Sequence, residues 1–290
     1  MSEAPEIWPV GKLLETTASF LADRGATDPR LDAQLLLSQV LGLTKVQLYI
    51  NFERLVTPAE LDKYRELVRR RARHEPVAYI LGRKEFYGLK FKATPAALIP
   101  RPETEHLVDT ALNLARELWP GQPLAVADIG CGGGAIALAL AKNLPEARIA
   151  AVDISPEALA LARENAQSLG LDHRVTFYQG DLMAPLVPLT FQLICANLPY
   201  IPSPEMGGLM PDVGLHEPRL ALNGGPSGLT LISRLLEEAP ARLQPGGRLL
   251  LEIWPDSRPE LEDLAGQAGF SRVEISRDLA GRNRLATLSR

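Results

Sequence analysis

The chain has 290 residues and a formal net charge of −4, with 46 % hydrophobic and 23 % charged residues. This composition is ordinary for a globular protein with a full core, and the length suits one large domain or a catalytic domain with a small second one. The acidic balance argues against a protein that wraps duplex DNA over its whole surface. No apolar run reaches the roughly 18 residues of a membrane span.

Cysteine usage and the first residues bear on the compartment. Cys131 and Cys195 are too few for a disulfide framework or a metal-ligand cluster. The start, MSEAPEIWPVGKLL, lacks the basic and then apolar segments of a secretory signal peptide. We therefore expect a cytoplasmic protein without a metal site. The histidines are scattered along the chain, and we assign no role to His74, His106, His173 and His216.

The first part of the chain predicts helix after helix. Helical periodicity is found in residues 11–25, 28–43 and 57–75. Asp28 before Pro29 is typical of an N-cap and a first turn, and Thr57 with Glu60 matches a capping box. Because no strand separates these helices, residues 1–83 predict a small helical bundle.

The third predicted helix carries a basic cluster. Such a cluster would suit an acidic protein surface or RNA, but we interpret it as a solvated helix face. The cluster consists of Arg65, Arg69, Arg70, Arg71 and Arg73.

The pattern changes after Gly82. Residues 84–94, KEFYGLKFKAT, predict a hairpin that turns at Gly88, and we take residues 84–102 as a linker. Strands are expected at 124–130, 148–154, 174–180, 191–197 and 247–254, and helices at 98–119, 134–144, 155–170, 228–243 and 257–269. This alternation is typical of an open, mostly parallel sheet with helices on both faces. Residues 272–290 predict two further strands as an antiparallel edge.

A glycine-rich loop follows the first of these strands. In VADIGCGGGAIALAL, a strand end is followed by Gly130, Gly132, Gly133 and Gly134 at a helix start. Glycines there let the backbone turn tightly and approach a ligand without a Cβ in the way. The spacing Gly130-x-Gly132-x-x-Ala135 also satisfies the dinucleotide fingerprint, so the loop by itself leaves NAD open.

Polar residues end other strands of the predicted sheet. Asp153 ends the second strand, where a carboxylate accepts hydrogen bonds from ribose hydroxyls. Asp181 and Leu182 follow the third strand, where an adenine would lie. Ligands of open α/β sheets bind beyond the carboxyl ends of the strands, so we expect Asp128, Asp153, Asp181 and Asn197 to share one edge.

The stretch LICANLPYIP decides between cofactor classes. It ends an apolar strand with Asn197, Leu198, Pro199 and Tyr200. A dehydrogenase has no special use for this tetrapeptide, whereas methyl transfer to a planar nitrogen does, because the lone pair of such a nitrogen is delocalised. If Asn197 Oδ1 and a backbone carbonyl accept its N–H groups, the nitrogen is held towards a sulfonium methyl. Positioning of this kind is worth on the order of 7–11 kcal/mol at the ideal limit.

The order of these motifs resembles the class I S-adenosylmethionine-dependent methyltransferases that act on planar nitrogens. More narrowly, the chain resembles the release-factor glutamine methyltransferases, the PrmC/HemK family. EPVAYILGRKEFYGLKF, LIPRPETEHLVD and HEPRLALNGGPSGL follow that family's order and spacing, and the likeness runs from about Leu13 to Leu288. It implies a Rossmann-like methyltransferase domain over residues 103–290 and a helical substrate-recognition domain over residues 1–83.

The resemblance also implies a reaction and its residues. The reaction is N5-methylation of the glutamine in the Gly-Gly-Gln motif of class-1 peptide chain release factors, with S-adenosyl-L-homocysteine as product. The implied cofactor-binding residues are Gly130, Cys131, Gly132, Gly133, Gly134, Asp153, Asp181, Leu182 and Asn197. The glutamine amide would be bound by Asn197 and the Leu198 carbonyl, in a slot shaped by Pro199 and Tyr200, behind an entrance formed by Arg101, Pro102 and Glu103. We expect a monomer without a membrane or specific nucleic-acid partner.

Two positions depart from the family pattern. Leu198 stands where the family usually has a proline, so φ is not locked there, and Trp254 stands where it commonly has glycine. Two alternatives remain open. An adenine-N6 nucleic-acid methyltransferase would have to flip its base and grip a phosphate backbone, against which the acidic balance counts. A non-catalytic adaptor would hold the cofactor without turnover, with Leu198 as the first sign of decay.

Overall fold

The structure is a computed structural model that describes residues 8–278 and 280–290. The segment read for a signal peptide falls largely on residues 1–7, which lie outside the described residues, as does Leu279 in the predicted tail. The chain divides into two compact units, Met1–Gly82 with Met210–His216, and Arg83–Leu209 with Glu217–Arg290. The segment Met210–His216 therefore groups with the helices, although the sequence-based division leaves it in the sheet domain.

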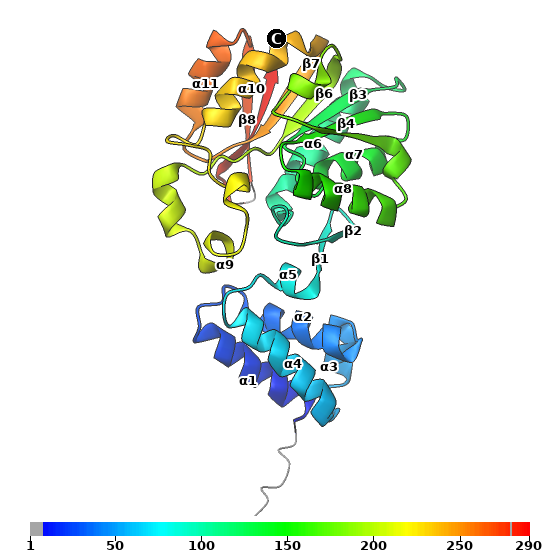
Figure 1. Ribbon diagram of the computed structural model, residues 1–290, viewed down its shortest axis with the longest axis vertical. Coiled ribbons are helices and arrows are strands. Elements are labelled where there is room, and N and C mark those ends of the chain that lie inside the picture. Colours follow the sequence, from blue (N-terminus) through cyan, green and yellow to red (C-terminus); the bar gives the residue numbers. More distant parts are fainter. Residues whose placement is uncertain (1–7, 279) are drawn as a thin grey trace, which may run out of the picture. The chain divides into compact units, whose positions relative to one another are not determined.

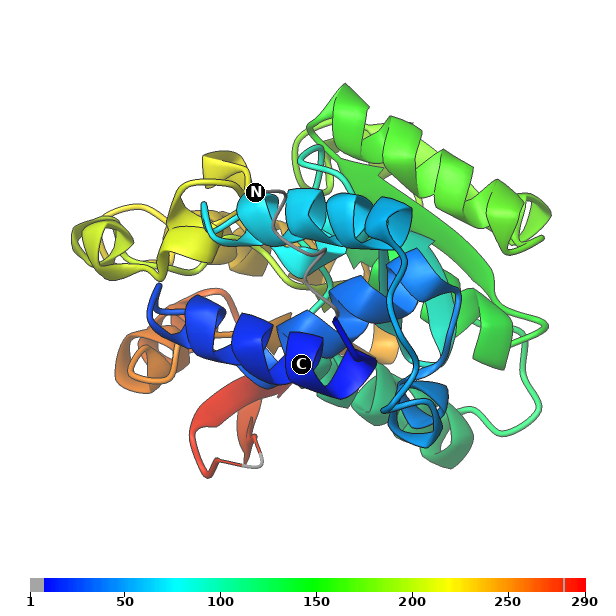
Figure 2. The same cartoon turned by 90° about the horizontal axis from the view of Figure 1, so that it is seen from below.

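The first unit is a bundle of helices, in agreement with the periodicity. Its elements are α1 (Val10–Ala22), α2 (Pro29–Leu41), α3 (Lys45–Ile50), α4 (Pro58–Arg71) and α5 (Val77–Leu81), with α9 (Pro211–Gly214) from the later segment. In Figure 2, α2 lies between α1 and α4, and it contacts both. The core between them contains the fully buried side chains of Leu36, Leu37, Leu48 and Tyr64.

Side-chain caps set the starts of three of these helices. The Asp28 side chain accepts a hydrogen bond from the Leu31 N–H at the start of α2. Thr57 and Glu60 form the predicted capping box of α4. A second capping box, formed by Thr44 and Gln47, starts α3. Helical periodicity does not predict α3, because a helix of six residues is too short to show a period.

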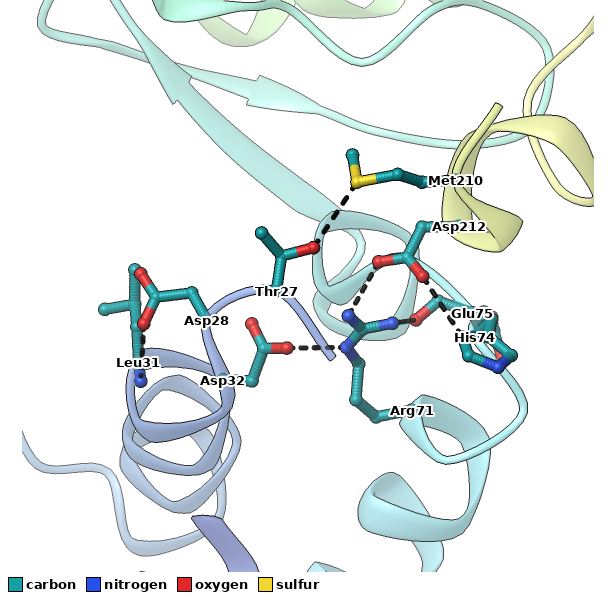
Figure 3. Close-up of polar contacts among 9 residues, drawn as sticks. All are labelled: Thr27, Asp28, Leu31, Asp32, Arg71, His74, Glu75, Met210 and Asp212. Carbon is teal, nitrogen blue, oxygen red and sulfur yellow. Dashed lines mark hydrogen bonds and ion pairs between the residues drawn. The ribbon is translucent and has the colours of Figure 1, made fainter. Parts of the chain in front are cut away.

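The interpretation of the α4 arginines as a solvated face is wrong for Arg71. Its side chain is 3 % exposed, with Nε 2.6 Å from an Asp32 carboxylate oxygen and one terminal nitrogen 2.6 Å from Asp212 (Figure 3). The Arg69 side chain, by contrast, is 65 % exposed. One arginine of the cluster therefore holds α2, α4 and the segment Met210–His216 together inside the first unit.

The second unit contains a seven-stranded sheet with strand order β5-β4-β3-β6-β7-β9-β8. The strands are β3 (Ala125–Ile129), β4 (Arg148–Asp153), β5 (Val175–Gln179), β6 (Phe191–Ala196), β7 (Leu243–Glu252), β8 (Arg272–Arg277) and β9 (Asn283–Ser289). The pairs from β5 to β7 are parallel, which confirms the predicted Rossmann-like sheet. The tail strands are antiparallel as predicted, but β9 pairs with both β7 and β8, so the edge strand is β8.

Helices cover both faces of this sheet (Figure 1). One face packs against α6 (Pro102–Leu118), α7 (Ala135–Asn143) and α8 (Pro156–Ser168), and the other against α10 (Thr230–Glu238) and α11 (Arg258–Gln267). The helix expected over 228–243 ends earlier, since Pro240 has no N–H to continue it, and β7 already begins at Leu243. Among the helices of residues 8–278 and 280–290, none has the length and apolar character to cross a membrane.

The predicted hairpin is the first part of the second unit, which begins at Arg83. It consists of β1 (Arg83–Phe86) and β2 (Leu89–Lys92), paired antiparallel with Phe86 opposite Leu89. The two turn residues have positive φ, 49° at Tyr87 and 70° at Gly88. A two-residue hairpin loop of type I′ needs this conformation at both positions, and a glycine adopts it without strain.

The strand order reverses beside β3. The chain adds β4 and β5 on one side of β3, and then β6 and β7 on the other. Ile129 of β3 is in register with Ala196 of β6, so the two strands end level with each other. Open α/β sheets bind ligands at such a reversal, beyond the carboxyl ends of the strands.

Candidate active site

A cavity of about 280 Å³ lies at the carboxyl ends of β3, β4 and β6, close to the lower end of the roughly 300–1,000 Å³ range of small-molecule sites. Eleven of the selected residues line it: Arg101, Gly130, Cys131, Gly132, Gly133, Asp153, Asp181, Leu182, Asn197, Leu198 and Pro199. Four other residues that the sequence predicts for the site do not belong to the lining that the structure describes: Pro102, Glu103, Gly134 and Tyr200. The structure thus brings the glycine loop and the tetrapeptide to one cavity.

Gly130 shows why the loop after β3 requires glycine. Its φ is +72°, and a Cβ on it would lie 2.8 Å from Cδ2 of Leu198. Both the left-handed backbone and the close approach exclude a larger residue. Leu198 is itself buried and belongs to the core on the α10 side of the sheet. Packing therefore restrains the turn at a position where the family's proline would lock φ.

Asp153 ties the glycine loop to the end of β4. One carboxylate oxygen accepts the Gly132 N–H at 2.7 Å, and the other accepts the Ser155 N–H at 2.9 Å. Burial raises the pKa of this carboxyl above its ordinary value, and the backbone N–H groups oppose that shift. A carboxylate oxygen has more than one acceptor position, so both oxygens can also accept from ligand hydroxyls in the cavity.

The turn after β5 is held by α10. Asp181 pairs with Arg234 at 2.7 Å, and the Met183 N–H donates to Glu238 at 3.0 Å. Between them Leu182 has φ +46°, a conformation that branched residues rarely adopt. The sequence analysis misses Arg234, which also lines the cavity, because nothing in the helical pattern of residues 228–243 distinguishes it.

Asp128 is buried behind the loop. Its Oδ2 accepts the Ala137 N–H at 2.9 Å, and its Oδ1 has no hydrogen-bond partner among the described residues. Burial is the main cause that raises the pKa of this carboxyl from 3.8 to about 7. The folded protein therefore holds a proton on Asp128 over a pH range in which the unfolded chain has released it.

Stability is expected to fall with rising pH because of this group. Between pH 5 and pH 8 the free energy of unfolding should drop by about 2 to 3 kcal/mol relative to Asp128→Asn, which has no proton to lose. Urea unfolding of both proteins at pH 5, 6.5 and 8 measures this difference. Asp172→Asn, an exposed position, serves as the control. A constant difference between wild type and Asp128→Asn across this range would contradict a raised pKa.

A chain of hydrogen bonds runs from the Asn197 side chain to Glu252. Asn197 Nδ2 donates to Oγ1 of Thr104 at 3.0 Å, and that hydroxyl donates to Oε2 of Glu252 at 2.7 Å. The Tyr200 hydroxyl donates to the other oxygen of Glu252 at 2.8 Å. The ring of Trp254 lies 6.4 Å from that of Tyr200, centroid to centroid, tilted by 42°. Trp254, for which the sequence offers no reason, thus packs beside this chain.

The stretch HEPRLALNGGPSGL contacts residues at and next to the cavity lining. Glu217 is buried, accepts the Ile99 N–H at 3.0 Å and forms an ion pair with Arg101. A Cβ on Gly228, where φ is +83°, would lie 2.3 Å from the Tyr200 carbonyl oxygen. Only glycine permits this contact between the two backbones. The stretch therefore positions both Arg101 and the tetrapeptide.

The described residues contain no cluster of three or more side chains that would hold a metal ion. Cys131 and Cys195 are free and buried, and burial raises the pKa of each thiol. A thiolate is the nucleophilic form, so neither cysteine is suited to attack a substrate.

The sequence analysis selects neither Thr104 nor Glu252. Glu252 had a detectable signal, because an acidic residue ends the apolar run of β7 at the same sheet edge as Asn197. Thr104 stands directly after the selected Glu103, and helical spacing alone does not indicate which residue of that first turn faces the cavity.

Comparisons with known proteins agree with this architecture. Residues 12–82 match the family model "PrmC N-terminal domain", and residues 122–256 match "Methyltransferase domain". A release factor glutamine methyltransferase of Geobacter sulfurreducens is 43 % identical over 285 residues, covering 98 % of both chains. One from Moorella thermoacetica is 46 % identical over 265 residues, covering 91 % of this chain and 92 % of the relative.

A solved structure supports the fold independently. A methyltransferase from Pyrococcus furiosus superimposes with a TM-score of 0.51 at 21 % identity, covering 71 % of this chain and 90 % of that one. At this identity the likeness shows the fold alone. The two full-length relatives go further, since their identity extends over both units. The chain therefore belongs to the family of release factor glutamine methyltransferases.

Proposed function

We propose that the protein transfers the methyl group of S-adenosylmethionine to N5 of the glutamine in the Gly-Gly-Gln motif of class-1 peptide chain release factors. The observation that carries the proposal is Asn197, which lines the cavity next to the glycine loop with its amide nitrogen already engaged by Thr104. The names of the relatives support the substrate.

The cavity residues fit this cofactor. Gly130 and Gly132 have positive φ, and a Cβ on Gly132 would approach nothing closer than Ala97, at 3.8 Å, which leaves room for the methionine part. Asp153 presents a partly desolvated carboxylate to the ribose hydroxyls. Asp181 and Leu182 form a turn in the same lining, where the adenine would lie. When bound, S-adenosylmethionine supplies an electrophilic methyl group on a sulfonium centre and leaves as S-adenosylhomocysteine.

Asn197 has the central role towards the substrate. Its Nδ2 is engaged by Thr104, so Oδ1 is the group it offers to a ligand. Oδ1 and the Leu198 carbonyl would each accept one N–H of the glutamine amide, which fixes the nitrogen and directs its lone pair at the methyl group. Positioning contributes on the order of 7–11 kcal/mol at the ideal limit. Pro199 would shape the slot, with Arg101, Pro102 and Glu103 at its entrance.

No strong base is needed before the transfer. As the new nitrogen–carbon bond forms, the nitrogen becomes cationic and releases a proton readily to solvent. Burial and the Glu252 carboxylate raise the pKa of Tyr200, so this phenol stays neutral and acts as a hydrogen-bond donor. Its ring would close the slot against the flat amide.

The helical unit is the proposed recognition domain. It is an independently packed bundle with its own core, and it matches the PrmC N-terminal model. We extend the proposal to a cytoplasmic enzyme, since a release factor acts in translation. We further propose that the enzyme is a monomer.

The test is transfer of labelled methyl from S-adenosylmethionine to a purified class-1 release factor. A second factor, with the Gly-Gly-Gln glutamine replaced by alanine, serves as the matched substrate control. Label on the native factor alone is expected, and mass spectrometry should place one added methyl on that glutamine. Label on neither factor, with cofactor binding intact, would refute the proposal and favour a non-catalytic adaptor. Label on adenine in nucleic acid would favour the other alternative.

A further inference from the structure

We propose that Thr104 and Glu252 are positioning residues, which fix the rotation of the Asn197 amide so that Oδ1, and not Nδ2, is offered to the substrate. The inference rests on the proposed function, because it names what orients the group that holds the glutamine amide. It adds two residues from elements distant in sequence, the first turn of α6 and the end of β7.

The chain of hydrogen bonds has a direction that Glu252 sets. An ionised carboxylate accepts hydrogen bonds and donates none. Glu252 is 2 % exposed and receives both Thr104 Oγ1 and Tyr200 OH, at 2.7 and 2.8 Å. Burial is the main cause that raises the pKa of Glu252, and these two hydroxyls and the positive charge of Arg284 oppose that shift. As a carboxylate, Glu252 accepts a hydrogen bond on each oxygen, so both hydroxyls are donors towards it.

Thr104 transmits this direction to Asn197. A threonine hydroxyl has one proton and two acceptor positions. Its proton is directed at Glu252, so it faces Asn197 only as an acceptor. The amide must then present Nδ2 at 3.0 Å, since Oδ1 at that place would meet an oxygen without a proton between them. Rotating the amide by half a turn would lose this bond and present N–H groups to the N–H groups of the glutamine.

The chain leads from the cavity into the protein interior. Asn197 and Thr104 line the cavity, Thr104 is only 4 % exposed, and the Tyr200 ring, which packs beside Trp254, carries the hydroxyl that bonds Glu252. In such surroundings a hydrogen bond is electrostatically stronger than in water, and a broken one is costly.

The experiment compares Thr104→Val, which keeps the shape and removes the hydroxyl, with Thr104→Ser, which keeps the hydroxyl. Thr104→Val is expected to lower kcat for release-factor methylation by about 10- to 100-fold. Its affinity for S-adenosylhomocysteine, measured by calorimetry, should change far less, by about twofold at most, because an interaction that acts in the transition state changes kcat and not ground-state binding. Thr104→Ser should recover most of kcat, and Glu252→Gln should resemble Thr104→Val.

Thr110→Val is the matched control. It is the same substitution two turns along α6, where the hydroxyl bonds the carbonyl of His106. Its kcat should equal that of the wild type. If Thr104→Ser were as impaired as Thr104→Val, or if Thr104→Val kept full kcat, the hydroxyl would have no orienting role and the proposal would be overturned.

A second readout does not depend on methyl transfer. The side-chain N–H resonances of Asn197, assigned by their loss in Asn197→Ala, should exchange slowly with water in the wild type and faster in Thr104→Val. Unchanged exchange would overturn the proposal even with an active enzyme. If exchange responds as expected but release factor is never methylated, the proposed function fails while the orientation of Asn197 stands.

Discussion

Asn197→Ala is expected to lower the rate of release-factor methylation by about 10²- to 10³-fold, the loss found when one preorganised hydrogen-bonding group is removed from a transition state. The loss should appear in kcat, because the amide acceptor acts on the orientation of the reacting nitrogen. Single-turnover methyl transfer at saturating cofactor measures it directly.

The fold should survive this change. Asn197 is partly exposed to the cavity, and its side chain bonds only Thr104 among the bonds described for it. Circular dichroism should therefore stay close to the wild type. Asn113→Ala, an exposed asparagine on α6, is the matched control and should keep full activity. Activity of Asn197→Ala within tenfold of the wild type would remove Asn197 from the centre of the proposed mechanism.

Arg71→Ala is expected to destabilise the helical unit by about 3–5 kcal/mol, because it leaves the buried Asp32 carboxylate without its partner. Arg71 bonds Asp32 and Asp212, each at 2.6 Å, and its side chain is 3 % exposed (Figure 3). The segment Met210–His216 loses an ion pair to α4 in this variant. Hydrogen exchange should show faster amide exchange in Met210–His216 and a lower denaturant midpoint for the helical unit.

The pH dependence of Arg71→Ala has a definite sign. Burial raises the pKa of Asp32, and Arg71 opposes that shift. Without Arg71 the folded-state pKa rises further above the unfolded value, so stability falls as pH increases through that window. The deficit should be smaller at pH 5 than at pH 8. Arg69→Ala, whose side chain is 65 % exposed, is the control and should change stability by less than about 1 kcal/mol.

The basic cluster on α4 illustrates what a sequence leaves open. Five arginines within nine residues look alike on a helical pattern, and the periodicity does not show that Asp212 meets one of them. That contact joins residues 141 positions apart. Whether a charged side chain on a helix face is solvated or buried depends on what packs against it, and this is a property of the tertiary structure.

Local features of the fold can be predicted from short stretches of the chain. Caps at Asp28 and Thr57, the turn at Gly88 and the glycine-rich loop from Gly130 each depend on neighbours a few residues away. Alternation of strands and helices predicted the parallel sheet. Because ligands of such sheets bind beyond the carboxyl ends of the strands, the cavity residues could be predicted to lie at one edge. These inferences needed only backbone geometry and periodicity.

The tertiary structure alone decided how the functional side chains are oriented. Asn197, Thr104 and Glu252 come from three elements up to 148 residues apart, and their order of donors and acceptors exists only once those elements pack. The packing of Leu198 against Gly130 and of Trp254 beside Tyr200 likewise depends on distant contacts. The direction of these hydrogen bonds depends on distances between elements that are far apart in the sequence. The spacing of residues within a short stretch of chain does not predict such distances.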